Sequence, residues 1–276
     1  MYTLNCKGKL LSLEKPLVMG IVNATPDSFY NPNPEKGLEG IVTLADKMVN
    51  EGVDILDIGG QSTRPGSARI IAEEEMARVL PLIKILTDKY PEIILSIDTY
   101  HSEVAVAAVT AGVAIVNDIS SGNMDTAMIK TVAALQVPYI CMHTKGSPET
   151  MQQNAIYEDV VKEVLDFLIK KVDECTRAGI KDIIIDPGFG FAKTISHNFI
   201  LLKNLSVFKI LEKPILAGLS RKSTVYKTLH TDAAKALNGT TVLNTLALLN
   251  GAAILRVHDV REAKEAIQLL AAYHKV

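Results

Sequence analysis

The chain has no tryptophan, and aromatic residues make up only 5% of its 276 positions. Few aromatic side chains leave little material for platforms on which nucleic-acid bases stack. The formal net charge is −2 at pH 7, and neither sign of charge gathers in a block. A basic track for nucleic acid or for lipid headgroups is therefore not indicated, and we expect neither class of partner.

Cysteine is also scarce. Cys6, Cys141 and Cys175 are far apart, without the short spacings of a structural zinc site. A disulfide framework is equally unexpected, so a reducing compartment is indicated. The N-terminal residues contain no continuous apolar core of a signal peptide, and no apolar run reaches the roughly 18 residues that span a bilayer. We expect a cytoplasmic protein without a membrane segment.

Short apolar runs recur along the chain, and no Ser/Gly-rich linker or low-complexity stretch separates them. The runs are rich in β-branched residues and do not alternate with polar ones, which is typical of strands covered on both faces. They are residues 17–23, 55–59, 93–98, 115–118, 139–143, 183–186, 215–218 and 254–257. We therefore predict eight buried strands in one domain that spans residues 1–276.

Longer segments with helical spacing of apolar residues lie between these runs. They are residues 38–50, 73–89, 157–178, 232–249 and 262–272, and Gly179 stands where a helix would end. Strands that alternate with helices indicate parallel βαβ units. Eight such units in a chain near the usual length of about 250 residues predict an α/β fold, a (β/α)8 TIM barrel. The first strand is not followed by GxGxxG, which disfavours a dinucleotide-binding sheet.

Three connections stand out. Residues 1–15 read as an N-terminal hairpin that turns at Lys7-Gly8 and plugs the amino-terminal end of the barrel. Residues 24–37 and 60–72 are unusually long strand-to-helix loops that contain prolines. Such loops lie at the carboxyl ends of barrel strands, where active sites form. We interpret both as mobile loops over an active site.

Polar residues end most of the predicted strands. They are Asn23, Asp57, Asp98, Asn117, Asp118, His143 and Asp186, then the segment Ser220-Arg221-Lys222-Ser223 after the seventh strand, and Arg256 with His258 on the eighth. In a barrel these positions converge on one cavity. Any single carboxylate among them could merely cap the following helix. The joint pattern instead indicates a ligand with a donor-rich edge and a separate anionic group.

The two halves of this pattern suit different chemistry. Asp98 and Asp186 can only accept hydrogen bonds when ionised, and unpaired burial would be costly. Arg256, with Lys222 and His258, offers donors for a phosphate group. The last two strands of a barrel frequently build such a site. The alternative for Arg256 and His258 is a salt bridge with Asp259.

Seven motifs now occur in order along the chain. They are Asn23-Ala-Thr-Pro-Asp-Ser-Phe29, Asp57-Ile-Gly-Gly-Gln-Ser-Thr-Arg-Pro-Gly66, Ser96-Ile-Asp-Thr99, Asn117-Asp-Ile119, Asp186-Pro-Gly-Phe-Gly-Phe191, Ser220-Arg-Lys-Ser223 and Arg256-Val-His-Asp-Val260. Together they strongly resemble the dihydropteroate synthases of folate biosynthesis. The resemblance extends from the first predicted strand to the eighth.

The resemblance implies a transferase that joins 6-hydroxymethyl-7,8-dihydropterin pyrophosphate to p-aminobenzoate, with SN1-like loss of pyrophosphate. It assigns the central chemistry to Asp98, Lys222, Arg256 and His258. Pterin binding falls to Asp98, Asn117, Met142, Asp186, Gly190 and Lys222; pyrophosphate binding to Asn23, Thr63, Arg64, Arg256 and His258; p-aminobenzoate binding to Thr63, Pro65, Phe191, Lys222 and Ser223; and support to Asp57, Phe29 and Ser220. Asn23 would also provide an oxygen ligand for Mg²⁺.

Further expectations follow from the same resemblance. It implies a homodimer formed through the later helices and competition by sulfonamides at the p-aminobenzoate site. The chain departs from the family after Phe29, where Tyr30-Asn31-Pro32 replaces a second acid and glycines. This departure puts a metal or loop contact in doubt and predicts a stiffer first loop.

Two rival functions stay open. A methyltetrahydrofolate:corrinoid methyltransferase shares the barrel and the middle-strand Asp and Asn residues, but it would not need Lys222, Arg256 and His258 directed at phosphate. A non-catalytic pterin-binding subunit would explain the altered first loop. It would give no physical reason to keep Asn23, Arg256 and His258.

Overall fold

Eight parallel strands form the barrel of the computed structural model, which describes residues 2–25, 37–61, 69–146 and 154–275. The strands are β3 (Leu17–Asn23), β4 (Ile55–Gly59), β5 (Ile94–Asp98), β6 (Ile115–Asp118), β7 (Tyr139–Met142), β8 (Ile183–Asp186), β9 (Leu216–Ala217) and β10 (Ile254–Val257). Their order is β8-β7-β6-β5-β4-β3-β10-β9, and a parallel bridge between Ile185 and Ile215 closes the ring.

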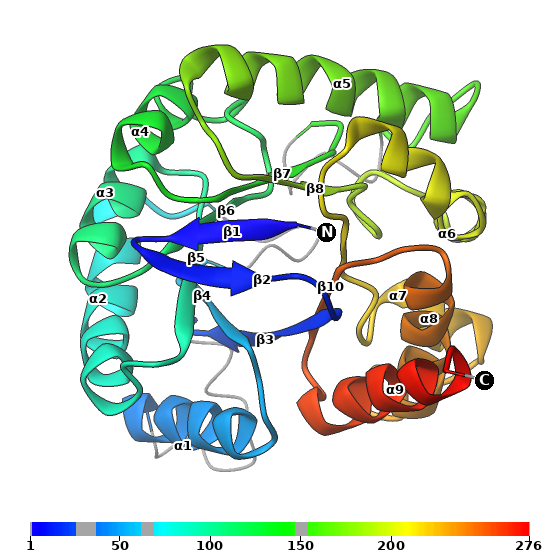
Figure 1. Cartoon of the computed structure of the whole chain (residues 1–276), viewed down its shortest axis with the longest axis horizontal. Helices are drawn as coiled ribbons and strands as arrows, with labels where there is room; N and C mark the ends of the chain where they lie inside the picture. The colour runs from blue at the N-terminus through cyan, green and yellow to red at the C-terminus, as the bar shows by residue number, and fades with distance from the viewer. Residues whose placement is uncertain (1, 26–36, 62–68, 147–153, 276) are drawn as a thin grey trace.

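Helices surround this ring of strands (Figure 1). They are α1 (Gly37–Asn50), α2 (Ala72–Lys89), α3 (Ser102–Thr110), α4 (Met128–Leu135), α5 (Val160–Ala178), α6 (Ile195–Lys203), the 3-10 helix η3 (Leu205–Leu211), α7 (Ser223–Thr228), α8 (Leu237–Leu249) and α9 (Val260–Tyr273). The predicted TIM barrel is confirmed. None of the helices that the structure describes combines the length and the apolar character needed to cross a bilayer.

The predicted strands at 17–23, 55–59, 115–118, 183–186 and 254–257 have the bounds that the structure shows. The run at 215–218 was predicted too long, since β9 covers only Leu216–Ala217. Pro214 precedes it and has no N–H to donate, so only its carbonyl takes part, accepting from Ile185 N at 3.0 Å. Two other predicted strands shorten by one residue, because β5 begins at Ile94 and β7 ends at Met142.

Three predicted helix starts were wrong. Helix α5 begins at Val160 rather than 157, because the Asp159 carboxylate accepts from the backbone N–H groups of Val161 and Lys162. Its end is confirmed, with Gly179 in the left-handed conformation. Helix α8 begins at Leu237 rather than 232, and α9 covers Val260–Tyr273 rather than 262–272. Helices α3, α4, α6 and α7 were not predicted, because they are short and α3 is apolar on most sides.

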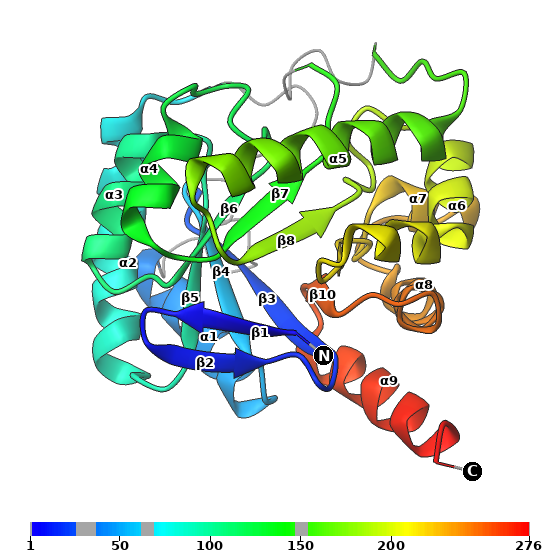
Figure 2. The same ribbon diagram turned by 45° about the horizontal axis from the view of Figure 1, so that its top comes forward.

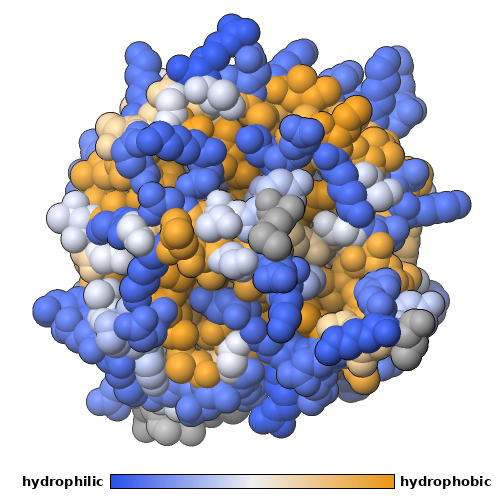
Figure 3. Space-filling model, in the orientation of Figure 1, coloured by the Kyte–Doolittle hydropathy of each residue, from blue (hydrophilic) through white to orange (hydrophobic). Residues whose placement is uncertain are grey.

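The N-terminal hairpin consists of β1 (Thr3–Cys6) and β2 (Lys9–Ser12), joined at Lys7-Gly8. Both turn residues have positive φ, 54° and 92°, as this two-residue turn requires. Leu4 and Cys6 are buried in one cluster with residues at the amino-terminal ends of the barrel strands. The prediction that the hairpin plugs this end of the barrel is therefore confirmed. Figures 1 and 2 show the hairpin across this end of the barrel, and in Figure 3 hydrophilic residues project around the edge of the same face.

Along the strands, the inward-facing side chains change from an aliphatic layer to a mainly polar layer two residues further on. Next to the hairpin, the inward positions are aliphatic: Ile55, Ile94, Ile115, Ile140, Ile184 and Ile254 belong to one buried cluster. Residues two apart on a strand face the same side. Two positions further on, these strands carry Asp57, Ser96, Asn117, Met142, Asp186 and Arg256. The aliphatic layer stabilises the fold, and the next layer supplies the chemistry.

Candidate active site

The strand register brings the polar strand ends to one level. Asn23 pairs with Gly59, Gly59 with Asp98, and Asp98 with Asn117. A Cβ atom added to Gly59 would lie 3.6 Å from both Asn23 Oδ1 and Asp98 Cβ. The side chains of Asn23 and Asp98 therefore flank Gly59 at the carboxyl end of the barrel.

Arg256 crosses the barrel to two buried carboxylates. Its Nε lies 2.6 Å from Asp57 Oδ2, and its Nη2 lies 2.6 Å from Asp98 Oδ2. Asp57 Oδ2 also accepts a hydrogen bond of 3.0 Å from Asn117 Nδ2. The third guanidinium nitrogen, Nη1, makes no hydrogen bond within the described part of the chain. Arg256 is therefore held in place, while the N–H groups of Nη1 stay available to a ligand as far as the described residues show.

The alternative partner for Arg256 is excluded. Asp259 instead forms a bidentate pair with Arg221, with two N–O distances of 2.8 Å. Arg221 Nη1 also donates to the carbonyl oxygens of Ala233 and Ala234 at 2.9 and 2.8 Å. The arginine of the Ser-Arg-Lys-Ser segment thus fixes the backbone around the site, and Arg256 is left for the interior.

Three acceptors face the same level of the barrel with unused capacity. Asp98 Oδ1, Asn117 Oδ1 and Asp186 Oδ2 make no hydrogen bonds among the residues that the structure describes. Burial raises the pKa of Asp98 to about 7, although the Arg256 guanidinium acts to lower it. Burial likewise raises the pKa of Asp186, against the opposing effect of Lys222. The pair is costly to keep charged and dry, which favours a ligand that brings N–H donors.

Lys222 provides the cation beside these acceptors. Its ammonium lies 2.5 Å from the Phe189 carbonyl oxygen and 4.7 Å from the centre of the Phe191 ring. Burial lowers the pKa of Lys222 to about 8, although the Asp186 carboxylate acts to raise it. An ammonium carries three donors, so the carbonyl leaves further protons for a ligand.

The loop after β8 depends on a glycine at Gly188. Its φ is +73°, and an added Cβ would lie 1.9 Å from the His143 carbonyl oxygen. Its N–H donates to Asp186 Oδ1 at 2.7 Å, which fixes that carboxylate. Gly190, a predicted pterin contact, also has positive φ, and its N–H donates to Asn198 Oδ1 at 2.8 Å. The close backbone approach thereby orients Asp186 toward the interior.

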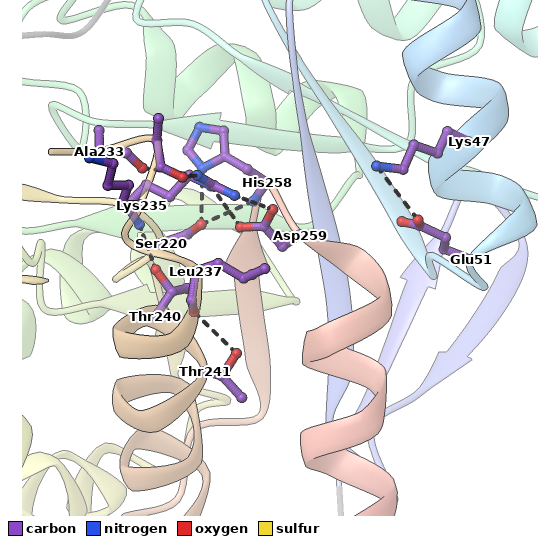
Figure 4. A network of polar contacts seen from close by, with 12 residues as sticks. Lys47, Glu51, Ser220, Ala233, Lys235, Leu237, Thr240, Thr241, His258 and Asp259 are labelled. Carbon is purple, nitrogen blue, oxygen red and sulfur yellow. Dashed lines mark hydrogen bonds and ion pairs between the residues drawn. The ribbon is translucent and has the colours of Figure 1, made fainter. Parts of the chain in front are cut away.

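Ser220 and His258 form the rim on the side of the last two strands. The Ser220 hydroxyl lies 2.9 Å from His258 Nδ1, and it accepts a hydrogen bond of 3.2 Å from the His258 backbone N–H. Figure 4 shows the two residues together with Asp259. The imidazole is exposed and the serine is buried. The serine thus orients a histidine that can reach a bound anion.

Asn23 is half-buried at the end of β3. Within the described residues there is no group of three or more His, Cys, Asp or Glu side chains that could hold a metal ion. A cage built from the protein alone is therefore not found in that part of the chain. Mg²⁺ prefers few protein oxygens, several waters and substrate phosphates, and Asn23 fits such a site.

An apolar wall borders the polar groups. Tyr100, Ile119, Met142, Phe191 and Ala192 form a separate buried cluster. Met142 and Phe191 are predicted substrate contacts, and Ser223, another predicted contact, begins α7 beside Lys222. Phe29, Thr63, Arg64 and Pro65 lie outside the described residues.

Two polar strand ends do not face the cavity. Asp118 accepts hydrogen bonds from Ser120 N, Gly122 N and the Tyr139 hydroxyl, so it secures a turn. It follows Asn117 directly, and neighbouring strand residues point to opposite faces. His143 lies one residue beyond β7, and its Nδ1 is 3.0 Å from the ammonium of Lys193. The expectation that these two side chains converge on the cavity was wrong.

Sequence reasoning gave no role to buried Lys193. Its ammonium lies 2.9 Å from the Phe191 carbonyl oxygen as well as near His143, so it ties the loop after β8 to the end of β7. Burial holds the pKa of Lys193 well below its usual range. The available signal was its position directly after the apolar residues Phe191 and Ala192.

Known proteins resemble this chain over nearly its whole length. Residues 19–258 match the family described as pterin binding enzyme. Dihydropteroate synthase of Escherichia coli K12 is 39% identical over 268 residues, which cover 96% of this chain and 94% of that protein. The structure of Xanthomonas albilineans dihydropteroate synthase with 4-aminobenzoic acid is 39% identical with a TM-score of 0.93, covering 99% of this chain and 98% of that one. Yersinia pestis dihydropteroate synthase in a sulfonamide drug complex is 35% identical with a TM-score of 0.94, covering 100% of both chains.

The fold, the ring of polar strand ends and these matches define the class. The chain belongs to the pterin-binding enzymes, and within them to the dihydropteroate synthases. It is a transferase of folate biosynthesis.

Proposed function

We propose that this site carries out the dihydropteroate synthase reaction by dividing its polar ring between the two ends of 6-hydroxymethyl-7,8-dihydropterin pyrophosphate. The observation that carries the proposal is a set of acceptors on Asp98, Asn117 and Asp186 that are unused within the described part of the chain and lie beside the cations Lys222 and Arg256. This set complements a ring with an N–H edge attached to an anionic leaving group.

The pterin ring occupies the middle of the barrel in this proposal. Its ring N–H and amino groups would donate to Asp98, Asn117 and Asp186, and Lys222 would donate to a ring acceptor. Met142 and Gly190 would contact the faces of the ring. Desolvation strengthens each of these hydrogen bonds, because water no longer competes with the pterin for the carboxylate oxygens.

The pyrophosphate would lie at the rim formed by the first and last strands. The free Nη1 of Arg256 and the imidazole of His258 would donate to its oxygens, while Asp57 and Ser220 hold these two side chains in place. Asn23 would hold Mg²⁺ there. A bound Mg²⁺ neutralises charge on the leaving pyrophosphate. Preorganised donors of this kind stabilise charge without having to reorganise during the reaction.

p-Aminobenzoate would approach along the apolar wall. Phe191 supplies an aromatic face beside Lys222, and Ser223 begins the following helix. Thr63, Arg64 and Pro65 would complete this side. The Yersinia pestis relative is described in complex with a sulfonamide drug, and we propose that sulfonamides compete with p-aminobenzoate here.

We propose that pyrophosphate leaves before the amine attacks. The C–O bond breaks, the electron-rich dihydropterin spreads the positive charge at the methylene, and Asp98 favours that cation. The neutral amine then forms the C–N bond, and the acidic arylammonium that results loses its proton to water or to the released pyrophosphate, so neither a strong base nor a covalent nucleophile on the protein is required. The expected sign is slow pyrophosphate release, with hydrolysed pterin, in the absence of p-aminobenzoate. If release strictly required the amine, the stepwise order would be wrong.

Turnover by the purified protein tests the function itself. With dihydropterin pyrophosphate, p-aminobenzoate and Mg²⁺, we expect one pyrophosphate for each dihydropteroate formed. Tight pterin binding with no turnover would contradict the proposal and favour a non-catalytic binding protein.

We also propose that two copies associate through α8 and α9. A groove of about 830 Å³ lies between these helices, lined in part by Leu237, Leu249, Leu269 and Tyr273. Leu269 and Tyr273 are 72% and 69% exposed. All three cysteines are free and buried, in keeping with a cytoplasmic protein.

A further inference from the structure

Two residues that follow Asp98 in sequence hold the two ends of the second strand-to-helix connection. The Tyr100 hydroxyl donates to Gln61 Oε1 at 2.7 Å, and His101 Nε2 lies 3.1 Å from the Ile70 carbonyl oxygen. Gln61 and Ile70 lie on opposite sides of the connection along the chain. The segment after β5 therefore fastens both ends of this connection to the strand that carries Asp98.

Thr99, which lies between Asp98 and Tyr100 in the sequence, adds a third link. Its hydroxyl donates to Glu75 Oε2 at 2.9 Å, and Glu75 is 1% exposed on α2. One turn further along the same helix, Arg78 Nη1 donates to the Gly60 carbonyl oxygen at 2.9 Å. Helix α2, the end of β4 and the segment after β5 thus form one rigid unit.

The ring of Tyr100 belongs to the apolar wall of the site. It is 5% exposed and clusters with Ile119, Met142, Phe191 and Ala192. Tyr100 therefore joins two structures, because its ring packs with the wall and its hydroxyl bonds to the base of the connection. Neither the ring nor the hydroxyl belongs to the charged set that faces the pterin edge.

Gln61 is oriented to accept. Its Oε1 faces the Tyr100 hydroxyl and lies 3.5 Å from the Ile70 backbone N–H, which can only donate. Gln61 is 6% exposed, so solvent competes little for this bond. The hydrogen bond fixes the position of the phenol ring along the wall.

We propose that Tyr100 is a positioning residue for p-aminobenzoate: Gln61 holds its hydroxyl, and its ring sets the position of Phe191. The inference rests on the proposed role of Phe191 at the p-aminobenzoate site. Loss of one buried neutral hydrogen bond corresponds to about a three- to tenfold change in an equilibrium constant. The change acts on binding of the amine, because Asp98, Lys222 and Arg256 keep their own contacts.

The test compares Y100F with a matched control. Y100F removes only the hydroxyl, and we expect KM for p-aminobenzoate to rise about three- to tenfold, with kcat changed by less than about twofold and the Kd of the pterin substrate unchanged. The control is Y139F, which removes a buried hydroxyl bonded to Asp118 outside the cavity. Y139F should lower Tm and leave both KM values alone. A Y100F enzyme that loses Tm like Y139F, without a change in KM, would show a merely structural role.

Variants of Gln61 keep the test independent of how well Y100F folds. Q61L removes the acceptor and should raise KM for p-aminobenzoate as Y100F does. The double variant Y100F/Q61L should have no larger effect than either single change, because both remove the same bond. Additive effects would overturn the proposal. Wild-type turnover is measured alongside: if it is absent, the proposed function fails, and if it is present while Y100F and Q61L behave as wild type, only the positioning role fails.

Discussion

Arg256 is the cation that pairs with two buried carboxylates of the site. It pairs with Asp57 and Asp98, which are 0% and 7% exposed. Removing such charges from water costs several kcal/mol for each ion, and only close pairing offsets that cost. The cluster of one cation and two carboxylates carries a formal negative charge when both carboxylates are ionised.

Substitution R256Q should therefore destabilise the protein as well as abolish turnover. It leaves two buried carboxylates without their cation, and we expect a loss of about 3–5 kcal/mol in the free energy of unfolding. Urea denaturation measures this value. The control R177Q removes an arginine whose side chain is 80% exposed, and it should change stability by less than about 1 kcal/mol. Equal midpoints for the two variants would contradict the role given to Arg256.

Lys222 should link activity to pH in a defined direction. Its pKa is lowered to about 8, so the ammonium loses its proton as the pH rises through that value. In the proposed function the charged form donates to the pterin, so we expect kcat/KM to fall above about pH 8. K222A should lose about 100-fold or more in kcat/KM and lack this alkaline limb, with an unchanged circular dichroism spectrum. K227A changes an exposed residue of α7, the helix that follows Lys222, and should keep the wild-type profile. An unaltered profile in K222A would remove Lys222 from the site.

At the scale of elements, the strands and the polar layer could be predicted from sequence. Strands buried on both faces leave unbroken apolar runs, and a period of two places Asp57, Asn117 and Asp186 on the interior face. What could not be predicted is which of two adjacent polar residues points inward. Asn117 faces the cavity and Asp118 faces away, and a shift of one residue would exchange them.

The ion-pair partner of Arg256 could not be predicted from the sequence either. Arg256 could have paired with Asp259, three residues away, yet it pairs with Asp57, which is 199 positions away. The barrel register brings them together only after all strands have paired. Short buried helices such as α3 were missed for a related reason, because a helix without a polar face has no helical period to detect.

The loop after β8 gives a prediction at this scale. G188A places a methyl group 1.9 Å from the His143 carbonyl oxygen at φ +73°, so the loop must move and Asp186 with it. We expect a loss of more than about 3 kcal/mol in stability, measured by thermal unfolding, and weaker pterin binding. The control G8A has a similar φ of +92° with nothing within 4 Å, and it should cost only about 1–2 kcal/mol. Similar losses in the two variants would show that crowding at Gly188 is unimportant.

At the scale of the whole molecule, the exposed apolar residues of α8 and α9 form the surface that we propose to bind a second copy of the chain. Leu249 and Leu269 line its groove and are 49% and 72% exposed. We expect light scattering to give twice the chain mass, and L249D with L269D to give a monomer, since two buried carboxylates cannot be solvated in such an interface. L10D alters a residue that is 75% exposed on the hairpin and should leave the dimer intact. A wild-type monomer at micromolar concentration would refute this interface.

In the proposed function the polar ring has two parts, the middle strands that bind the pterin and the rim that binds pyrophosphate. Two isosteric or nearly isosteric variants test these parts separately. D186N keeps an oxygen to accept from Gly188 but turns a donor toward the pterin N–H edge. H258Q removes the imidazole at the rim and leaves the middle strands unchanged. The backbone N–H groups of Gly188 and His258 keep acceptors in both variants, so we expect both to fold, and circular dichroism checks this before binding is compared.

Calorimetry with 6-hydroxymethylpterin and, separately, with pyrophosphate and Mg²⁺ measures both halves. We predict that D186N loses at least about tenfold in pterin affinity while it binds pyrophosphate normally, and that H258Q shows the reverse. If each variant weakened both ligands to the same extent, the ring would not be divided as proposed.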